Sequence, residues 1–250
     1  MNFKSKLVRA DSSLAPMKIS IVIPALNEAE SILETLLSVK QQDGDFEIIV
    51  VDGGSADATS QKARPHSSVI FSERGRALQM NAGARQANGE ALLFLHADSR
   101  LHPHALSKLR HTLQDPGIVG GTFTLRFDSD RFFLKLYAAF TRFKFRYFHY
   151  GDQGIFVKRS AFEQLGGFKE MPIMEDIDFL LRLRKQGRVA LINSSVTTSS
   201  RRFVTHGVVR QQLLNTLLVS LYLIGVKPEI LSRWYLSEKR LPRQKHKRES

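Results

Sequence analysis

The alternation of short apolar strands with helix-forming segments constrains the fold of this chain more than any other feature. Residues 18–24 (KISIVIP) and 47–52 (EIIVVD) are rich in β-branched apolar residues, and further strands are expected at 68–72 and 91–97, with a helix at 76–88 between them. Strand–helix units of this length predict parallel strands joined by crossover helices. Ligands bind such sheets beyond the carboxyl ends of the strands, so we expect the function of this α/β domain to lie there.

Local signals after the first two strands predict two helices. Asn27, followed three residues later by Glu30, matches a capping box, and a helix is expected from there to about Gln41. Residues 53–55 (GGS) predict a turn, after which Asp57 caps a second helix.

The pattern changes beyond the first four strands. A strand is expected at 118–127, an aromatic-rich helix at 131–148, and a turn with a strand in GDQGIFVKR at 151–159. Helices are expected at 159–165 and 175–186. Since no internal repeat or linker composition occurs, the sequence predicts one domain with a C-terminal appendage.

Composition excludes several classes of protein. Hydrophobic residues make up 42% and charged residues 24%, as in globular proteins, which excludes a disordered or collagen-like chain. The absence of cysteine excludes a disulfide framework, a thiolate zinc site and a cysteine nucleophile, and it favours a reducing compartment. Residues 1–16 lack the apolar stretch of a secretory signal, so a cytoplasmic location is expected.

The net charge is concentrated in the last third of the chain. Of the total of +13, residues 179–250 carry +12, with 15 Lys and Arg against three Glu, whereas residues 1–178 carry +1. This distribution argues against a uniformly basic nucleic-acid binder and predicts a balanced catalytic body with a cationic surface that faces an anionic partner. Membrane phosphates and nucleic acid are both candidates for this partner.

Three acidic residues lie where predicted strands end. Glu28 follows the first strand, Asp52 ends the second, and Asp98 ends the segment ALLFLHAD. Because an unpaired carboxylate is costly there, they indicate a polar ligand or a cation, with turn or helix-cap roles as the alternative for each. In an extended strand His96 and Asp98 share one face, and a divalent cation that carries phosphates needs only one or two carboxylates.

A fourth acidic group, Glu175, Asp176 and Asp178, begins the helix expected at 175–186. Acidic residues in a first turn complement the helix dipole, which is a structural explanation for them. The functional alternative is that Asp176 is a general base, which takes a proton from an acceptor hydroxyl, with Glu175 beside it to orient the acceptor. Position alone leaves both explanations open.

Six motifs occur in an order and spacing typical of one enzyme family. They are VIPALNE at 22–28, VDGGSADAT at 51–59, GRALQMNAGARQANGE at 75–90, HAD at 96–98, GGF at 166–168 and MEDIDF at 174–179. Over about residues 18–205 the chain therefore resembles the family 2 glycosyltransferases, inverting enzymes of the GT-A fold. Its compact size and the segments GDQGIFVKR and SSRRF are similar to those of a bacterial single-domain subgroup.

The resemblance implies a site for a UDP- or GDP-linked sugar donor and for a divalent cation, Mn²⁺ or Mg²⁺. Asp98 matches the last position of the family's metal-binding Asp-x-Asp motif and is the implied metal ligand, whereas His96 stands at the first position, which departs from the family pattern. The residues implied to bind the donor are Pro24, Leu26, Glu28, Asp52, Arg76 and Asp98.

The resemblance also implies an acceptor side. Asp176 matches the catalytic base of the family's Glu-Asp motif, and the chain lacks the Gln-x-x-Arg-Trp segment typical of processive synthases. A single, non-processive transfer to a hydroxyl acceptor, such as a lipid-linked one, is therefore expected. The other residues implied to contact the acceptor or the diphosphate are Asp152, Gln153, Glu175, Arg201 and Arg202.

Two functions from other classes stay open. A nucleotidyltransferase also uses a Rossmann-like sheet and carboxylate-held magnesium, but the loop ALNEAE after the first strand is acidic and lacks the expected glycines. A non-catalytic nucleic-acid-binding protein would explain the charge, but the basic residues follow no RNA- or DNA-binding motif. We therefore expect a hexosyltransferase-type enzyme with no nucleic-acid partner.

The C-terminal third predicts a segment at a membrane surface. The apolar stretch Leu213–Val226 has 14 residues, whereas a membrane-spanning helix needs roughly 20. Polar residues recur in it every four positions and leave a wide apolar face, while cations flank it on both sides. We expect the amphipathic region, residues 206–236, to lie on the inner face of the plasma membrane, with packing on the core or on a second subunit as the alternative.

These observations divide the chain into four parts. A GT-A domain is expected at 17–205 and the amphipathic region at 206–236. The extension at 1–16 and the basic tail at 237–250 are expected to be disordered.

Overall fold

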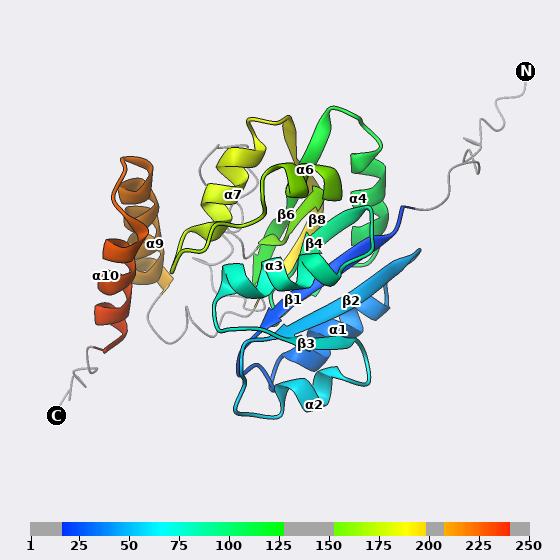
Figure 1. The fold of residues 1–250 in the computed structure, drawn as a ribbon, viewed down its shortest axis with the longest axis horizontal. Coiled ribbons are helices and arrows are strands. Elements are labelled where there is room, and N and C mark those ends of the chain that lie inside the picture. The colour runs from blue at the N-terminus through cyan, green and yellow to red at the C-terminus, as the bar shows by residue number, and fades with distance from the viewer. Residues whose placement is uncertain (1–16, 128–152, 199–207, 241–250) are drawn as a thin grey trace, which may run out of the picture.

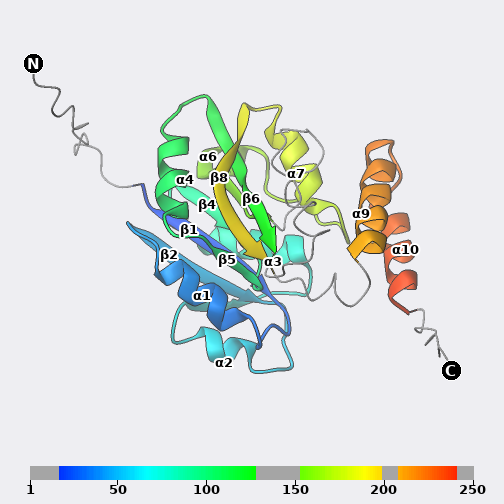
Figure 2. The ribbon, with the colours of Figure 1, turned by 180° about the vertical axis from the view of Figure 1, so that it is seen from behind.

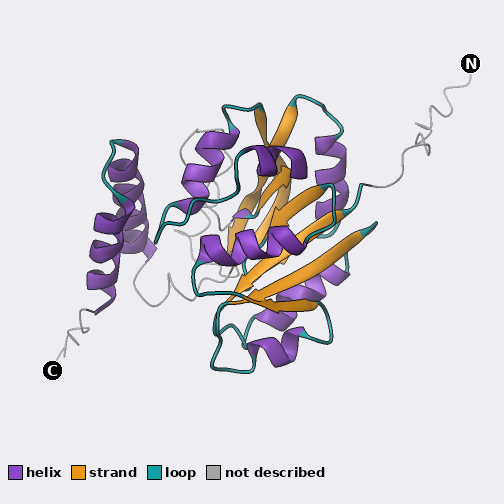
Figure 3. Ribbon diagram, viewed as in Figure 1, coloured by secondary structure: helices purple, strands orange, loops and turns teal. Residues whose placement is uncertain are grey.

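The structure, a computed structural model, describes residues 17–127, 153–198 and 208–240. In these ranges eight strands form one sheet in the order β3-β2-β1-β4-β7-β6-β8-β5, with helices on both faces (Figures 1 and 3). The strands are β1 (Ile19–Ala25), β2 (Phe46–Asp52), β3 (Ser68–Phe71), β4 (Ala91–Phe94), β5 (Ser99–Leu101), β6 (Ile118–Phe127), β7 (Ile155–Lys158) and β8 (Arg188–Thr198). The helices are α1 (Ile32–Lys40), α2 (Thr59–Ala63), α3 (Arg76–Gln86), α4 (Ala105–Leu113), α6 (Arg159–Gln164), α7 (Glu175–Leu183), α9 (Val208–Leu223) and α10 (Pro228–Arg240).

The first four strands confirm the predicted parallel sheet. β1 pairs in parallel with β2 and β4, and β2 pairs in parallel with β3. Beyond β4 the direction changes, because β7 runs antiparallel to both β4 and β6, while β6 and β8 are parallel. The carboxyl ends of β1, β2 and β4 therefore meet at one edge of the sheet.

Alternate residues of β1 face opposite sides of the sheet. Ile21 belongs to a buried cluster that includes Leu36 of α1, and Val22 belongs to a second cluster that includes Met80 of α3 and Phe179 of α7. Figure 1 shows α3, α6 and α7 over one face, and Figure 2 shows α1 and α4 over the other. Burial on both faces explains why β1 and β2 are continuous apolar runs.

Helix α3 lies very close to the sheet at Gly83. A Cβ atom at this position would be 2.3 Å from Cγ1 of Val22, so no side chain fits. The close approach fixes α3, and with it Arg76 and Gln79, against the ends of β1 and β2.

The first helix begins later than predicted. Asn27 has a left-handed φ of 54°, and α1 begins at Ile32, so the predicted capping box of Asn27 and Glu30 is wrong. The carboxamide oxygen of Asn27 instead accepts a hydrogen bond from the N–H of Ala56 at 2.8 Å. Asn27 therefore joins the loop after β1 to the loop after β2.

Strand β4 is shorter than predicted. It ends at Phe94, because the chain then turns and the N–H of Ser99 donates to the carbonyl oxygen of His96 at 3.1 Å. His96 and Asp98 therefore lie in a turn and not on one face of a strand. The turn leads into β5, which pairs antiparallel with β8, and the sequence patterns predict neither of these two strands.

Other sequence predictions are confirmed, corrected in part, or lie outside the described residues. The helices expected at 76–88, 159–165 and 175–186 are present as α3, α6 and α7, although α7 ends at Leu183. The N-cap of α2 is Ala58 and not Asp57 as predicted, although Asp57, one residue earlier, accepts a hydrogen bond from the N–H of Thr59 at 3.0 Å. The aromatic-rich helix expected at 131–148 and the extension at 1–16 lie outside the described residues.

The C-terminal region consists of two helices that we call the C-terminal hairpin. α9 and α10 lie side by side at one edge of the molecule (Figures 1 and 2), and Gly225, with a φ of 96°, lies between them. α10 continues to Arg240, so the first residues of the predicted tail are helical. Across the ranges that the structure describes, no helix combines the length and apolar character needed to cross a bilayer.

Candidate active site

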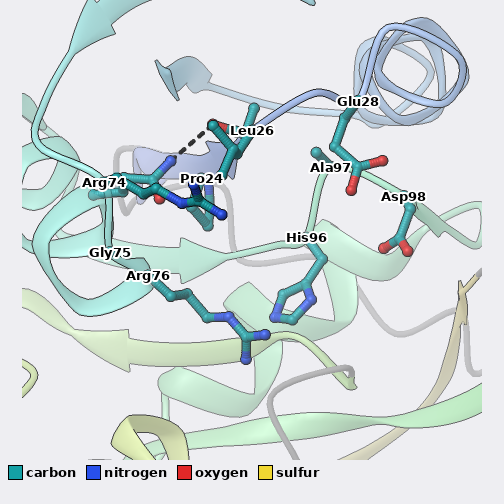
Figure 4. Close-up of a pocket in the computed structure, with 11 residues that line it drawn as sticks. Pro24, Leu26, Glu28, Arg74, Gly75, Arg76, His96, Ala97 and Asp98 are labelled. Carbon is teal, nitrogen blue, oxygen red and sulfur yellow. Dashed lines mark hydrogen bonds between the residues drawn. The ribbon is translucent and has the colours of Figure 1, made fainter. Parts of the chain in front are cut away.

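A pocket of about 260 Å³ lies at the carboxyl ends of β1 and β4, as the sheet topology predicts. Three segments line it: residues within 24–28 at the end of β1 and just beyond it, within 74–79 at the start of α3, and 96–98 after β4 (Figure 4). The lining includes Arg74 and Gln79, which the sequence analysis missed. It also includes most of the residues implied to bind a donor, namely Pro24, Leu26, Glu28, Arg76 and Asp98.

Gln79 connects α3 to the ends of two strands. It is buried, and its Nε2 donates hydrogen bonds to the carbonyl oxygens of Ala25 at 2.8 Å and Val51 at 2.9 Å. A polar residue on the inner face of an expected helix, one turn after its start, is the signal by which Gln79 could have been found.

Asp52 lies beside the pocket and is fully buried, at 1% exposure. Its Oδ1 accepts hydrogen bonds from the N–H groups of Gly54 at 3.0 Å and Ser55 at 2.7 Å, and its Oδ2 accepts one from the hydroxyl of Ser60. Burial raises the pKa of Asp52, but these hydrogen bonds lower it by more, so the pKa lies below its ordinary value. A charged carboxylate therefore organises the turn after β2.

The charged side chains of the pocket are separated by sign. Figure 4 shows Glu28 and Asp98 with their carboxylates on one side, whereas the ring of His96 and the guanidinium of Arg76 point toward one another on the other side. The pocket thus offers an acidic side that suits a cation and a basic side that suits an anion.

The turn that carries Asp98 is held by a buried hydroxyl. Thr35 of α1 is 0% exposed, and its Oγ1 donates to the carbonyl oxygen of Ala97 at 2.8 Å. Glu28 is also fixed locally, since it accepts a hydrogen bond from the hydroxyl of Ser31 at 2.8 Å. The backbone of the turn and the carboxylate of Glu28 are therefore each held by a hydrogen bond.

Among the described residues, no group of three or more His, Cys, Asp or Glu side chains is arranged to hold a metal ion. Asp98 and Glu28 can still contribute to a cation site whose other ligands are water and phosphate oxygens. Hard divalent cations that carry phosphates bind in this manner, through one or two carboxylates.

An ion pair joins the pocket to α7. Nη1 of Arg76 lies 3.2 Å from Oε1 of Glu175, whose side chain is only 5% exposed. A buried carboxylate needs a partner of this kind, since its desolvation is otherwise costly. The pair brings the start of α7, and with it Asp176, next to the N-terminus of α3.

Asp176 lies in the first turn of α7. It is partly exposed, and its Oδ1 accepts a hydrogen bond from the N–H of Ile177 at 2.8 Å. α7 begins immediately after Met174, which has a left-handed φ of 71°. Three acidic residues in this turn complement the helix dipole, so the structural explanation and a catalytic role are compatible.

Asp178 is the centre of a buried polar network, which the sequence analysis did not foresee. It is 7% exposed, and it accepts hydrogen bonds from Nε of Arg182 at 2.6 Å and Nζ of Lys169 at 3.0 Å. Arg182 in turn donates to the carbonyl oxygens of Leu165 at 2.9 Å and Gly167 at 2.8 Å. Burial raises the pKa of Asp178, but the bonds from Arg182 and Lys169 lower it by more, so it lies below its ordinary value.

The loop before α7 is also bound to α3. Nδ2 of Asn81 donates to the carbonyl oxygen of Phe168 at 2.8 Å, and the N–H of Phe168 donates to Oδ1 of Asn81 at 2.9 Å. Gly167 has a φ of 75°, and a Cβ there would be 2.6 Å from Oδ1 of Asn81. α3 and α7 are thus joined at two places, which accounts structurally for the GGF motif.

Of the other residues implied to contact the acceptor or the diphosphate, one more lies within the described residues. Gln153 is fully buried just before β7. Asp152, Arg201 and Arg202 lie outside the described residues.

The sequence model of the family described as "Glycosyl transferase family 2" matches residues 20–165, more than half of the chain. This chain belongs to glycosyl transferase family 2. The match favours the expected glycosyltransferase over the nucleotidyltransferase and nucleic-acid-binding alternatives. The matched range includes the whole pocket lining, whereas α7 with Asp176 lies beyond it.

Two curated relatives illustrate the range of the family 2 glycosyltransferases to which the chain is similar. Glycosyltransferase AglE of Haloferax volcanii is 27% identical over 172 residues, which cover 64% of this chain and 54% of AglE. Undecaprenyl-phosphate 4-deoxy-4-formamido-L-arabinose transferase of Proteus mirabilis is 32% identical over 118 residues, which cover 42% of this chain and 36% of that protein. The chain thus spans about half or less of the length of these relatives.

A solved structure confirms the fold of this family 2 glycosyltransferase. Mannosyltransferase PcManGT from Pyrobaculum calidifontis, solved in complex with GDP-Man and Mn²⁺, has a TM-score of 0.63 and 22% identity. The similarity covers 87% of this chain and 67% of that one. The GT-A fold expected from the sequence is therefore present.

Proposed function

We propose that this glycosyltransferase moves a sugar from a UDP- or GDP-linked donor to a hydroxyl group of its acceptor with inversion, and that Asp176 is the general base. The ion pair between Arg76 and Glu175 carries this proposal, because it joins the pocket to the helix turn that holds Asp176. An inverting transfer needs a base on one side of the sugar and a stabilised diphosphate on the other. The pocket and the start of α7 supply these two sides.

The transfer is a single displacement. The Asp176 carboxylate takes the proton of the acceptor hydroxyl as that oxygen attacks the anomeric carbon of the sugar. The bond from this carbon to the diphosphate oxygen breaks, and its electron pair stays on the diphosphate. Attack opposite the leaving group inverts the anomeric configuration.

The basic side of the pocket suits the diphosphate. Arg74 and Arg76 line it, and Arg76 is the first residue of α3, where the helix dipole favours negative charge. The remaining contacts follow the implied assignments: Pro24, Leu26, Glu28 and Asp52 for the nucleoside, and Asp152, Gln153, Arg201 and Arg202 for the acceptor and the diphosphate.

Asp98 is proposed to hold a divalent cation, Mn²⁺ or Mg²⁺, with Glu28 on the same side of the pocket. When bound, such a cation neutralises negative charge on the leaving diphosphate. That the structural relative PcManGT was solved with GDP-Man and Mn²⁺ supports this assignment.

Binding of nucleotide diphosphates tests the donor site. We expect wild-type protein to bind UDP or GDP more tightly with Mn²⁺ than with EDTA, because the cation neutralises negative charge on the diphosphate. Asp98→Asn should abolish this difference, whereas Asp43→Asn, at an exposed carboxylate remote from the pocket, should not. Isothermal titration calorimetry measures both. Equal affinity of the wild type with Mn²⁺ and with EDTA would contradict the metal role of Asp98.

The C-terminal hairpin supports a location on the inner face of the plasma membrane, with a lipid-linked acceptor. Leu213 and Leu217 of α9 are 67% and 53% exposed and, four residues apart, share one helix face, and Ile224, just after α9, is 78% exposed. Trp234 of α10 is 51% exposed, and the hairpin at 208–240 carries five Lys and Arg against two Glu. Amphipathic helices that bind anionic lipid combine these features, and the Proteus mirabilis relative is named for an undecaprenyl-phosphate substrate.

Vesicle flotation tests this location. We expect the full chain to float with vesicles that contain phosphatidylglycerol at low salt, and to float less at high salt, because salt screens the cationic surface. Leu213→Ser combined with Ile224→Ser should weaken binding about tenfold or more, since less apolar area is buried in the bilayer. Leu33→Ser, at an exposed leucine of α1, is the matched control. Wild-type protein that stays at the bottom of the gradient at low salt would contradict the proposal.

A further inference from the structure

The two faces of α9 have different surroundings. Leu218 and Val219 are buried and Tyr222 is half-buried, whereas Leu213, Leu217 and Ser220 are exposed. Residues 218, 219 and 222 share one helix face. On this packed face, which we call the inner face of α9, the hydroxyl of Tyr222 lies one turn from Leu218 and Val219.

The hydroxyl of Tyr222 reaches the network around Asp178. It donates a hydrogen bond to Oδ1 of Asp178 at 3.3 Å, between residues 44 positions apart in the chain. Burial and the Asp178 carboxylate raise the pKa of Tyr222 above its ordinary value, so the hydroxyl keeps its proton and can donate. The same Oδ1 accepts from Lys169, and Oδ2 accepts from Arg182, so Tyr222 adds a donor from the hairpin to the two that this carboxylate receives from other parts of the chain.

The first turn of α7 is thereby held on two sides. Glu175 pairs with Arg76 of the pocket, and Asp178 binds Tyr222 of the hairpin, with Asp176 between them in the chain. A helix rises 1.5 Å per residue. A shift of this turn therefore moves Asp176 relative to the pocket, and small misplacements of a reacting group are costly in rate.

We propose that Tyr222 is a positioning residue that acts through Asp178 to hold the Asp176 carboxylate in place relative to the donor pocket. This inference rests on the proposed function of Asp176. If Tyr222 acts in this way, turnover depends on the contact between the C-terminal hairpin and α7. The hairpin surface that we assign to the membrane is then linked to the base that performs the transfer.

Tyr222→Phe tests the inference, because it removes one hydroxyl and keeps the ring. The probe is the UDP- or GDP-linked sugar that the enzyme hydrolyses fastest in a panel of such donors, with water as acceptor. We expect kcat to fall about tenfold, as for the loss of one hydrogen bond to a charged group, with the donor KM unchanged within about twofold. Ser220→Ala, which removes an exposed hydroxyl from the same helix, should leave both constants unchanged.

A double-mutant cycle with Asp176→Asn separates this inference from the proposed function. If Tyr222 acts through Asp176, Tyr222→Phe should lower kcat in the wild type but not in the Asp176→Asn background. A wild-type kcat for Tyr222→Phe, alone or together with a lower unfolding temperature, would show a packing role and overturn the inference. So would a tenfold loss in both backgrounds. Near-normal turnover of Asp176→Asn would instead overturn the proposed function, whatever Tyr222→Phe does.

Discussion

Asp176→Asn is expected to lower the rate of sugar transfer or donor hydrolysis by about 10²–10⁴, the range for removal of a general base. Asparagine keeps the size of the side chain and a carbonyl oxygen that can accept the N–H of Ile177 as Asp176 does, so the start of α7 should stay intact. The carboxamide cannot take a proton from the acceptor. The measurement is kcat with the fastest donor of a panel of UDP- and GDP-sugars.

Donor binding provides the control for this prediction. Asp176 is not part of the pocket lining, so the variant should bind UDP or GDP with Mn²⁺ as tightly as the wild type does. Glu170→Gln, which changes a carboxylate of the loop before α7, should leave kcat unchanged. A turnover within about threefold of the wild type would remove Asp176 from the role of base, because even weak general-base catalysis contributes more.

Asp178→Ala is expected to lower the free energy of unfolding by about 3–5 kcal/mol, because it removes one partner of a buried ion pair. The change leaves Arg182 and Lys169 without their carboxylate and removes the contact between α7 and Lys169. Urea unfolding at pH 7 measures the effect. Glu163→Ala breaks the exposed pair with Arg159, also at a spacing of four residues, and should cost below about 1 kcal/mol. Equal costs for the two variants would contradict the role of the network.

The network should also make stability depend on pH. Because the pKa of Asp178 is lower in the folded protein than in the unfolded chain, its contribution is present above the unfolded value and is lost as pH falls through the folded value. We therefore expect the wild type to lose stability toward acid more steeply than Asp178→Ala does. Parallel curves for the two proteins would show that Asp178 adds no pH dependence.

The alternation of strands and helices in the sequence predicts the parallel part of the sheet, because local residue patterns are enough to identify its strands. The runs at 18–24 and 47–52 are apolar because both faces of β1 and β2 are buried, and this pattern can be read from the residues alone. The edge at which Glu28 and Asp98 meet follows from parallel strand direction, and it was correctly expected. Asn27 was misread because its side chain is used by a loop 29 positions away, which no local pattern records.

The missing parts of the site depend on contacts between distant residues. β5 is three residues long and is defined by its pairing with β8, about 100 positions later. Gln79 looks like an ordinary polar residue of a helix until its two carbonyl partners are known. Asp178 was assigned to the helix dipole together with its neighbours, whereas Lys169, Arg182 and Tyr222 give it a different role from Asp176.

The stereochemistry of donor turnover tests the central claim most directly. When a donor whose sugar is linked through an α bond is hydrolysed, real-time proton NMR shows which anomer forms first, before mutarotation in water. The account predicts that the wild type releases the β anomer and that Asp176→Asn releases almost none. Initial release of the α anomer, or wild-type rates of β release by Asp176→Asn, would contradict an inverting transfer with Asp176 as its base.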